Sequence, residues 1–382
     1  MPYKGAFLIA VSGGHTRSVA CAIGSEAQIL GVVEGESLNM HTYPHQEVVF
    51  RFVRLLDELA STVGVRIDEF RRRATRIVLS MAGAGTVTDH RLIEHFLLHD
   101  TWAEPNTYII LDDTWAGLLA GTLSCTGVCA FAGTGASVYV SEKIGETIDF
   151  HDDTQLSIMS EVRFHGGKRK IDGWGPTIGD FGSGFQLATD MFRLFNRELD
   201  RGNPPELFRE VLREDRDLRT IGNVQLWFDS LYIRYTDWRI RFAKLASVAT
   251  SAADRGDPHA ITLVKKAAYD MIESIVVAIE KFPQARTMPI VFQGGMFEFS
   301  KLYRDTVAEG AQKMTSGPVY LAMFRPIIGA LVLAMADSPK IPDKSALGNL
   351  LGQIKDLSER DRALLIRSDG HAPQGMEVLN AV

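Results

Sequence analysis

Close to the N-terminus, two short apolar segments are separated only by a glycine-containing turn. Residues 6–11 and 18–23 are strand-like, and the sequence between them begins Ser-Gly-Gly-His-Thr. Two strands joined by so short a turn predict a β-hairpin, in which the chain reverses direction. A dinucleotide-binding unit would instead enter a helix directly after its glycines. The pattern therefore argues against a dinucleotide-binding fold.

Glycine-rich turns follow three further strand-like segments in a fixed order along the chain. They are LDDTWAG at 111–117, FAGTGAS at 131–137 and FQGGMFEFS at 292–300, and GWGPTIGDFGSG at 173–184 lies between the last two. Each turn alone is a weak signal, because glycine is common in ordinary loops. Together, in this order, we interpret them as the parts of one ATP-dependent phosphotransfer site.

The apolar patterns predict a definite order of strands and helices along the chain. The first half is predicted to run strand 6–11, strand 18–23, strand 29–34, helix 44–64, strand 76–80, helix 89–98, strand 107–111, a helix from Asp113 to near Gly121, and strands 127–132 and 136–140. The second half is predicted to contain amphipathic helical runs at 181–196, 204–212, 237–253 and 259–282, then strand 289–292, helices 300–314, 327–336 and 347–354, and a loose last dozen residues.

Length and charge restrict the possible partners. At 382 residues the chain is long enough for two domains of ordinary size. Its net charge of −6 gives no indication of a nucleic-acid or anionic-membrane partner. The longest apolar stretches, such as 327–336, are shorter than the roughly 18 residues that a membrane-spanning helix needs. We therefore expect no nucleic-acid partner and no membrane partner.

The cysteines Cys21, Cys125 and Cys129 are too few and too scattered for a disulfide framework. They fit a reducing cytoplasm, and the apolar run at the N-terminus is too short for the core of a signal peptide. Gly127 separates the last two cysteines and no histidine lies nearby, so we expect buried small side chains there and not a metal site. The expected location is the cytoplasm.

Two glycine turns are suited to binding phosphate. The turn at residues 12–16 puts backbone N–H groups and the Thr16 hydroxyl at a hairpin tip, where larger side chains would block a polyphosphate. The Gly133-Thr134-Gly135 turn joins two apolar strands and is interpreted as a second phosphate cradle, with a hydroxyl that can donate to a phosphate or a sugar oxygen. Taken alone, the first turn is better interpreted as a plain hairpin, and the second could equally be one.

Two aspartates lie where a strand ends and a helix begins. Asp113 is interpreted as a general base for a substrate hydroxyl, because open α/β proteins bind ligands at the carboxyl ends of their strands. The alternative is that it caps the helix N-terminus. Asp112 is an adjacent competitor, and alternation along the strand predicts that the two side chains point to opposite faces.

Two further glycine-rich segments are interpreted as ligand-binding. Gly294-Gly295 follows a strand, and small residues there would let an adenine or a ribose lie flat on the backbone. Trp174 and Asp180 stand among glycines in the segment 173–184, ahead of a helix expected to start at the next residue. A carboxylate there could again be an N-cap, but an indole and a carboxylate would also suit a polar, ring-shaped ligand.

With these segments in place, the chain resembles the N-acetylglucosamine kinases and the wider BadF/BadG/BcrA/BcrD-type ATPase family of the sugar-kinase/actin/Hsp70 superfamily. The resemblance covers roughly residues 6–336. Its most specific element is GWGPTIGDFGSGFQLA, which is similar to the family's GWG…GDEGS segment, with Phe181 where an acidic residue is usual. LNMH at 38–41 is similar to the family's Asn-His substrate segment.

The resemblance implies two actin-like (ribonuclease H-like) lobes, each a mixed β-sheet flanked by helices, with a nucleotide cleft between them. The lobes are expected at 1–122 and 123–336, the second with a helical insertion at about 181–282, followed by a C-terminal extension at 337–382. By resemblance, Asp113 would be the base, and the sugar site would be lined by Asn39, Thr134, Gly135, Trp174 and Asp180. ATP would be held by Gly13, Gly14, Thr16, Gly133, Gly294 and Gly295.

One position departs from the family pattern. The first phosphate loop of the family usually opens with an acidic residue that helps to place Mg²⁺, often through water, whereas this chain has Ser12 there. A serine hydroxyl can bind a metal-bound water but adds no charge, so Asp112 is considered as a second, weak contact to the metal. Phosphoryl transfer depends on charge neutralisation, so the site could be slow or could bind without turnover.

The leading hypothesis is a kinase that uses ATP and Mg²⁺ to phosphorylate a hydroxyl of an amino sugar, with N-acetylglucosamine as the first candidate. The expected partner is thus a small-molecule sugar, and the resemblance implies a homodimer. One alternative is an ATPase that activates a partner reductase, although the cysteines form no recognisable cluster-binding pattern. Another is a catalytically weak or silent sugar- and nucleotide-binding protein, suggested by Ser12.

Overall fold

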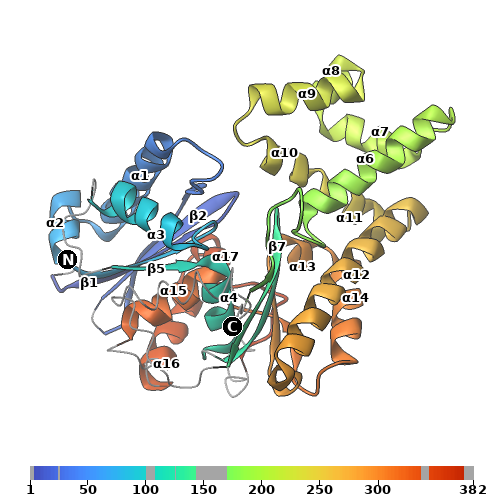
Figure 1. Ribbon diagram of the computed structural model, residues 1–382. Helices are drawn as coiled ribbons and strands as arrows, with labels where there is room; N and C mark the ends of the chain where they lie inside the picture. The colour runs from blue at the N-terminus through green and yellow to red at the C-terminus, as the bar shows by residue number, and fades with distance from the viewer. Residues whose placement is uncertain are drawn as a thin grey trace. The chain divides into compact units, whose positions relative to one another are not determined.

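The computed structural model describes residues 4–24, 26–99, 108–124, 126–142, 170–336 and 344–373. These residues form an α/β protein with two five-stranded sheets, in the orders β3-β2-β1-β4-β5 and β10-β9-β6-β7-β8. Helices flank both sheets (Figure 1). The predicted fold class, two mixed sheets flanked by helices, is confirmed.

Packing within the chain divides it into two compact units. The first contains Met1–Cys129, Tyr139–Lys170 and Tyr320–Val382, and the second contains Ala130–Val138 and Ile171–Val319. The predicted lobes were defined by resemblance to a family, and a division by packing does not test them. The domain boundaries at 122 and 336 therefore stay a prediction.

The first sheet begins with the predicted hairpin. β1 pairs with β2 and β2 with β3 in antiparallel orientation, whereas β1 pairs with β4 and β4 with β5 in parallel orientation. The carboxyl ends of three parallel strands therefore lie together at one edge of the sheet. The strands are β1 (Phe7–Gly13), β2 (Arg17–Gly24), β3 (Ile29–Glu36), β4 (Ala74–Met81) and β5 (Tyr108–Asp112).

One face of this sheet is covered by α1 (His45–Val63), close to the helix predicted over 44–64. Its apolar stripe, including Phe52 and Leu56, packs in one cluster with Ile9 and Leu79 of the sheet, and all four are almost fully buried. Burying a side chain of this size contributes roughly 1.5–3 kcal/mol. The alignment of this stripe with the alternating strand residues fixes which face of each strand points toward α1.

The opposite face is covered by α15 (Pro326–Met335), which also packs against α4 (Asp113–Thr122). Figure 1 shows α1 and α15 on the two sides of the first sheet. The two helices α4 and α15 approach closely because of Gly329, where an added Cβ would lie 2.0 Å from the Ala116 carbonyl oxygen. α4 is therefore almost entirely buried, and its N-terminus is fixed at the end of β5.

Helices dominate the second unit, as predicted. The run predicted over 237–253 forms two helices, because the N–H of Leu245 bonds the carbonyl three residues back, on Phe242, at 3.1 Å. The helices are α6 (Gly184–Asp200), α7 (Glu206–Glu214), α8 (Arg216–Ile221), α9 (Val224–Arg234), α10 (Trp238–Lys244), α11 (Ala246–Asp254), α12 (Pro258–Lys281), α13 (Gly295–Phe299) and α14 (Lys301–Gln312). α12 and α14 lie side by side (Figure 1).

The second sheet contains the predicted strands β6 (Thr126–Ala132), β7 (Ala136–Glu142) and β9 (Ile290–Gln293). Its two edge strands, β8 (Lys170–Asp172) and β10 (Val319–Leu321), were not predicted. At three residues each, they are too short to show the alternation that identifies a strand from sequence. α2 (Ile67–Arg73), α8 and α9 were missed as well. The helix predicted over 89–98 is α3 (Val87–Ile93), followed by a π-helical stretch, Glu94–His99.

The described part of the C-terminal extension is an integral part of the first unit. It contains α16 (Lys344–Gln353) and α17 (Glu359–Leu365). The Gln353 side chain accepts the Ile29 N–H at 2.9 Å, and the buried Arg367 guanidinium donates to the Ala322 carbonyl at 3.0 Å. The prediction that the last dozen residues are loose falls largely outside the described residues, which end at 373.

Within the described ranges, no helix combines the length and the apolar character needed to cross a membrane. Cys21 and Cys129 are free thiols with no exposed surface, and for Cys129 this confirms the predicted buried small side chain. Burial raises the pKa of both thiols far above its usual value, so both are protonated. Cys125 lies outside the described residues.

Candidate active site

The turn between β1 and β2 is a tight hairpin, as the sequence predicts. The Gly14 N–H donates to the Arg17 carbonyl at 2.9 Å, and Thr16 is exposed at the tip. The fold itself requires the first glycine, because a Cβ added at Gly13 would lie 2.6 Å from the sulfur of Met81. This glycine therefore has a packing role whether or not phosphate binds there.

Ser37, which the sequence analysis missed, connects this turn to the predicted sugar-binding asparagine. Its hydroxyl donates to the Gly14 carbonyl at 2.9 Å and accepts the Asn39 N–H at 3.3 Å. Asn39 is buried, and its side-chain oxygen accepts the N–H of His41 at 2.8 Å. Because the side-chain oxygen already accepts this hydrogen bond, the amide NH₂ of Asn39 is the group that can donate to a ligand. The structure thus brings two of the predicted site segments together.

The register of the first sheet places the turn and the aspartates in one row. Gly13 is paired with Met81, and Met81 is paired with Asp112. Since neighbouring strands lie about 4.8 Å apart, roughly 10 Å separates the backbone of the turn from that of the aspartate. Asp113 is the next residue and the first of α4. The first glycine turn and the carboxylates therefore lie at the same edge of one sheet.

Asp112, and not Asp113, is the N-cap of α4. Its Oδ1 accepts the Thr114 N–H at 2.9 Å, and its Oδ2 accepts a hydrogen bond from the Lys170 ammonium at 2.9 Å. Burial raises the pKa of Asp112, but the lysine charge and the Thr114 donors outweigh it and hold the pKa below its ordinary value. Asp112 is therefore ionised, and the alternative interpretation of Asp113 as a cap is wrong.

Asp113 is in the opposite electrostatic situation. Burial raises its pKa, the neighbouring Asp112 charge raises it further, and the opposing effect of Lys170 is smaller, so its pKa is about 7. A carboxylate with this pKa can accept and release a proton at neutral pH, which is what an efficient general base needs. The pair of aspartates thus combines a fixed charge with a titrating group.

Two serine hydroxyls lie in one row of the first sheet, next to the first turn. Ser12 is paired in register with Ser80, whose buried hydroxyl has no hydrogen-bond partner among the described residues. Alternation places both hydroxyls on the face opposite the one to which the Cβ of Asp112 points. Within those same residues, no group of three or more His, Cys, Asp or Glu side chains could hold a metal ion. A cation there would depend on waters and on a bound phosphate.

In the second unit, the Gly133-Thr134-Gly135 turn is bound to the start of α6. The Gly184 N–H donates to the Gly133 carbonyl at 2.8 Å, and the Phe185 N–H donates to the Thr134 carbonyl at 3.3 Å. A helix N-terminus therefore fixes the carbonyl side of this turn. A Cβ added at Gly133 would meet only ordinary contacts, the nearest at 3.5 Å from the Phe131 ring.

The glycine-rich loop ahead of α6 brings Asp180 to the same turn. A Cβ added at Gly135 would lie 2.8 Å from Asp180 Oδ2, and Asp180 Oδ1 accepts the Gly175 N–H at 3.2 Å. The helix does not start at Phe181 as predicted, because Asp180 and Gly182 both have positive φ angles, of 57° and 83°. Ser183 is the N-cap instead, and the interpretation of Asp180 as a cap is wrong. Trp174 in the same loop is 44% exposed.

The two glycines after β9 differ in what the fold requires of them. Gly294 has a φ of 99°, and a Cβ added there would lie 2.4 Å from the Ala132 carbonyl oxygen. A Cβ on Gly295 would meet only the Phe299 ring, at 3.5 Å. The fold therefore explains Gly294, whereas packing places no such requirement on Gly295, and its role in holding a nucleotide stays a prediction.

Three residues with evident local functions escaped the sequence analysis, namely Ser37, Lys170 and Asp172. Each acts through contacts with residues distant in sequence or through loop conformation, for which a sequence pattern gives no signal. Asp172 has one recognisable feature, since it directly precedes the Gly-Trp-Gly segment.

The fold class is that of the sugar kinases. A proposed N-acetylglucosamine kinase of Chromobacterium violaceum aligns with a TM-score of 0.62 at 20% identity, over 87% of this chain and 99% of that one. A glucokinase of the ROK family from Streptomyces griseus, solved with glucose and AMPPNP, aligns with a TM-score of 0.52 at 15% identity, over 86% of this chain and 99% of that one.

The chain belongs to the BadF/BadG/BcrA/BcrD ATPase family, whose sequence model matches residues 10–334. It is 23% identical to the N-acetyl-D-glucosamine kinase of Dictyostelium discoideum over 342 residues, which are 86% of this chain and 97% of that protein. It is 22% identical over 276 residues to an N-acetylmuramic acid/N-acetylglucosamine kinase of Clostridium acetobutylicum. These residues are 72% of this chain and 79% of that protein. The family predicted from the glycine-rich segments is confirmed.

Proposed function

We propose that this protein is an ATP-dependent kinase that phosphorylates a hydroxyl of an amino sugar, with N-acetylglucosamine as the first candidate. In the reaction, the sugar hydroxyl oxygen forms a bond to the γ-phosphorus of ATP. The bond between that phosphorus and the β,γ-bridging oxygen breaks, and ADP leaves with its electron pair. The hydroxyl proton passes to the carboxylate of Asp113. Both curated relatives described above carry kinase names for N-acetylated sugars.

The observation that carries this proposal is the electrostatic state of Asp113. It is buried at the carboxyl end of β5, and burial together with the Asp112 charge gives it a pKa of about 7. A surface aspartate would be too weak a base to take a proton from an alcohol at the moment of attack. Asp112 is held ionised by Lys170 and so maintains the raised pKa of its neighbour.

The remaining site residues have proposed binding roles. Asn39 has an amide that can donate to a sugar oxygen, and Asp180 has a carboxylate that can accept from a sugar hydroxyl. Trp174 can cover an apolar sugar face. Thr134 and Gly135 complete the proposed sugar set, and the proposed ATP set is Gly13, Gly14, Thr16, Gly133, Gly294 and Gly295.

Mg²⁺ is proposed as the accompanying metal, because it neutralises triphosphate charge during transfer. Mg²⁺ commonly keeps several waters and binds through substrate phosphates with one or two protein contacts. The hydroxyls of Ser12 and Ser80 are suited to binding such waters. Asp112 is the proposed second, weak contact, although its Cβ points to the opposite face of the sheet and the Lys170 ammonium bonded to its Oδ2 competes for that role. We expect chelation of divalent metal to abolish turnover and added Mg²⁺ to restore it.

The proposed kinase is favoured over an activator of a partner reductase. An activator that carries a metal cluster needs accessible cysteine thiolates, and Cys21 and Cys129 are completely buried and protonated. A silent binding protein remains the second candidate, because Ser12 adds no charge to the first phosphate turn. Such a protein would bind the sugar without producing ADP.

Sugar-dependent release of ADP tests the proposal. The purified protein is supplied with MgATP and, separately, with N-acetylglucosamine, N-acetylmuramic acid, glucose or no sugar, and ADP is measured in a coupled assay. We expect ADP release that depends on an N-acetylated sugar, with a phosphate ester of that sugar detected by ³¹P NMR. Calorimetric binding of sugar without ADP release would support the silent binding protein.

The proposal includes a homodimer in the cytoplasm. The dimer follows from the family resemblance, and the location follows from the sparse cysteines, which form no disulfide framework in the sequence. Sedimentation velocity at micromolar concentration would measure the oligomeric state. A single species with the mass of one 42.2 kDa chain would contradict the dimer.

A further inference from the structure

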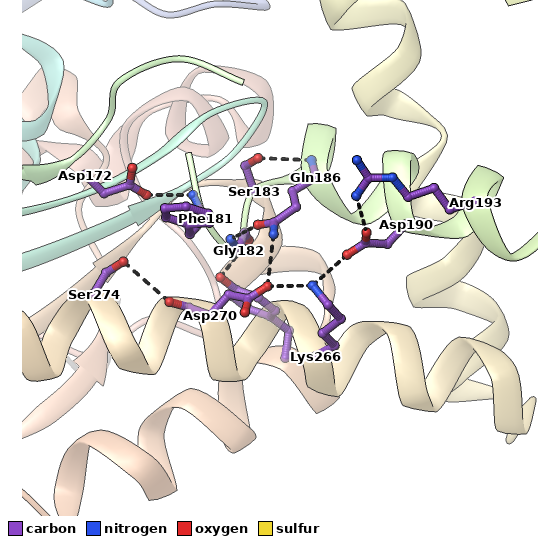
Figure 2. Close-up of polar contacts among 11 residues, drawn as sticks. Asp172, Phe181, Gly182, Ser183, Gln186, Asp190, Arg193, Lys266, Asp270 and Ser274 are labelled. Atoms are coloured by element: carbon purple, nitrogen blue, oxygen red, sulfur yellow. Dashed lines mark hydrogen bonds and ion pairs between the residues drawn. The ribbon is translucent and has the colours of Figure 1, made fainter. Parts of the chain in front are cut away.

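The loop that carries Asp180 is bound at its base by a second carboxylate. Asp172 is the last residue of β8, and its two oxygens accept the N–H groups of Asp180, at 2.9 Å, and of Phe181, at 2.6 Å. Figure 2 shows the contact between Asp172 and Phe181. A charged carboxylate that accepts two adjacent backbone N–H groups forms strong hydrogen bonds and fixes the peptide planes between them.

Both aspartates have unusual backbone conformations. Asp172 has a φ of 58° and Asp180 a φ of 57°, a region that residues other than glycine rarely adopt. Such conformations are costly and persist only where surrounding contacts impose them. The two hydrogen bonds from the loop to the Asp172 carboxylate are contacts of that kind, so they offset the cost of the Asp180 conformation.

The space for the Asp172 carboxylate comes from a glycine in the same loop. A Cβ added at Gly179 would lie 2.6 Å from Asp172 Oδ1 and 2.9 Å from the Trp174 Cβ. The loop therefore closes around the carboxylate, and burial raises the pKa of Asp172 although the N–H groups around it lower it. The carboxylate is thus an internal anchor of the loop.

A separate polar network holds the other end of the loop. The Gly182 carbonyl accepts the Tyr303 hydroxyl at 2.8 Å, and the Gly182 N–H donates to the Gln186 side chain. Gln186 donates in turn to Asp270 at 3.0 Å, which also binds Lys266 (Figure 2). With one end fixed to α12 and α14, the position of Asp180 depends on how the other end is held.

We propose that Asp172 is a positioning residue for sugar binding, because it holds the loop so that Asp180 stands against the Gly135 turn. It would not contact the sugar. This inference rests on the proposed role of Asp180 in binding the sugar. Phe181 stands at a position where the family usually has an acidic residue. It donates its backbone N–H to Asp172, and this contact does not depend on which side chain the residue carries.

Two substitutions separate the carboxylate from the backbone conformation. Asp172→Asn keeps the size and tolerates the left-handed backbone, but its NH₂ group would face one of the two N–H donors. Asp172→Gly relieves the backbone strain and removes the side chain altogether. Asp254→Asn, an exposed aspartate of the same unit, is the matched control. If only the backbone conformation mattered, the glycine variant would behave like the wild type.

Hydrogen exchange of residues 175–187, followed by mass spectrometry, is measured together with steady-state kinetics. For both Asp172 variants we expect faster exchange in this segment, a KM for the sugar raised about tenfold or more, and kcat and the KM for ATP within about threefold of wild type. Unchanged exchange would overturn the proposal. Faster exchange with an unchanged KM for the sugar, or a glycine variant with wild-type exchange and KM, would also overturn it.

The exchange measurement keeps this inference separate from the proposed function. If the wild-type protein phosphorylates no sugar at all, the kinase proposal fails and calorimetric sugar binding replaces KM. Weaker sugar binding with faster exchange in both Asp172 variants would still support the positioning role. Equal binding in wild type and variants would refute it.

Discussion

Each compact unit contains a pair of aspartates, and the two pairs are organised in different ways. In the first unit, Asp112 and Asp113 are adjacent in sequence, and the partly buried Lys170 keeps the first of them ionised. In the second unit, Asp172 and Asp180 are eight residues apart and are joined through a backbone N–H. In both pairs one carboxylate, that of Asp112 or Asp172, binds groups of the protein. The other, that of Asp113 or Asp180, is proposed to contact the sugar.

The difference lies in what each internal carboxylate controls. Asp112 places a negative charge beside Asp113, so it sets the pKa of its neighbour. Asp172 accepts main-chain hydrogen bonds, so it sets the conformation of a loop and not the charge of Asp180. Changes in the first pair should therefore alter the rate and its pH dependence, whereas changes in the second should alter affinity for the sugar.

The largest effect is expected for Asp113→Asn. The amide cannot take a proton, so kcat should fall by about 10³-fold, while the dissociation constant for the sugar should change less than about threefold. ADP release and calorimetry measure the two quantities. Asp57→Asn, an exposed aspartate of the same unit, is the control and should retain wild-type kcat. An unchanged kcat in Asp113→Asn would refute the assignment of the base.

Lys170→Met should shift the pH dependence. The lysine charge lowers the pKa of both aspartates, so its removal raises the pKa of Asp113 above about 7 and leaves it protonated over more of the neutral range. The acid limb of the activity profile should move to higher pH, with a loss of about tenfold at pH 7. Lys170→Arg keeps the charge and should keep the limb in place. A limb at the same pH in the methionine variant would contradict the proposed coupling.

The glycines after β9 allow a matched comparison of fold and ligand. Gly294→Ala should destabilise the protein by about 1–3 kcal/mol, because its φ of 99° and the nearby Ala132 carbonyl leave no place for a Cβ. Gly295→Ala should leave the melting temperature unchanged and raise the KM for ATP by about threefold to tenfold. Thermal unfolding and initial rates measure both. A wild-type KM for ATP in Gly295→Ala would remove that residue from the proposed nucleotide set.

The smallest effect is expected for Ser12→Asp. If the missing negative charge limits metal binding, the variant should need less Mg²⁺ for half-maximal activity and should show a kcat raised by about twofold to fivefold. A titration of the rate with Mg²⁺ at saturating ATP measures this. An unchanged or lower rate would mean that the metal is held in another way.

The sequence predicted the first unit better than the second, for physical reasons. Strand ends can be located from apolar runs, and parallel strands bring their carboxyl ends to one edge, so the turn at Gly13 and the aspartates at 112 and 113 could be placed. The choice between the two aspartates as helix cap could not be made, because it depends on the direction of one side chain and on Lys170, 58 residues away from Asp112.

In the second unit the glycine-rich loop was recognised but its conformation was not. The positive φ angles of Asp172 and Asp180 delay the start of α6 to Gly184, and aspartate carries no reliable sign of this conformation. The role of Asp172 depends on hydrogen bonds that exist only in the folded loop. The short edge strands and the pairing of the C-terminal residues with 322–324 also depend on contacts distant in sequence.

The pH dependence of kcat/KM for the sugar tests most directly whether Asp113 is a base whose pKa is raised by its surroundings. Since this ratio reports ionisations of the free enzyme, we expect it to rise tenfold per pH unit below about 7 and to level off above that value. A base with an ordinary aspartate pKa of about 3.9 would be ionised throughout the range from roughly pH 5.5 to 8.5. A profile that is flat over this range would therefore contradict a raised pKa of Asp113.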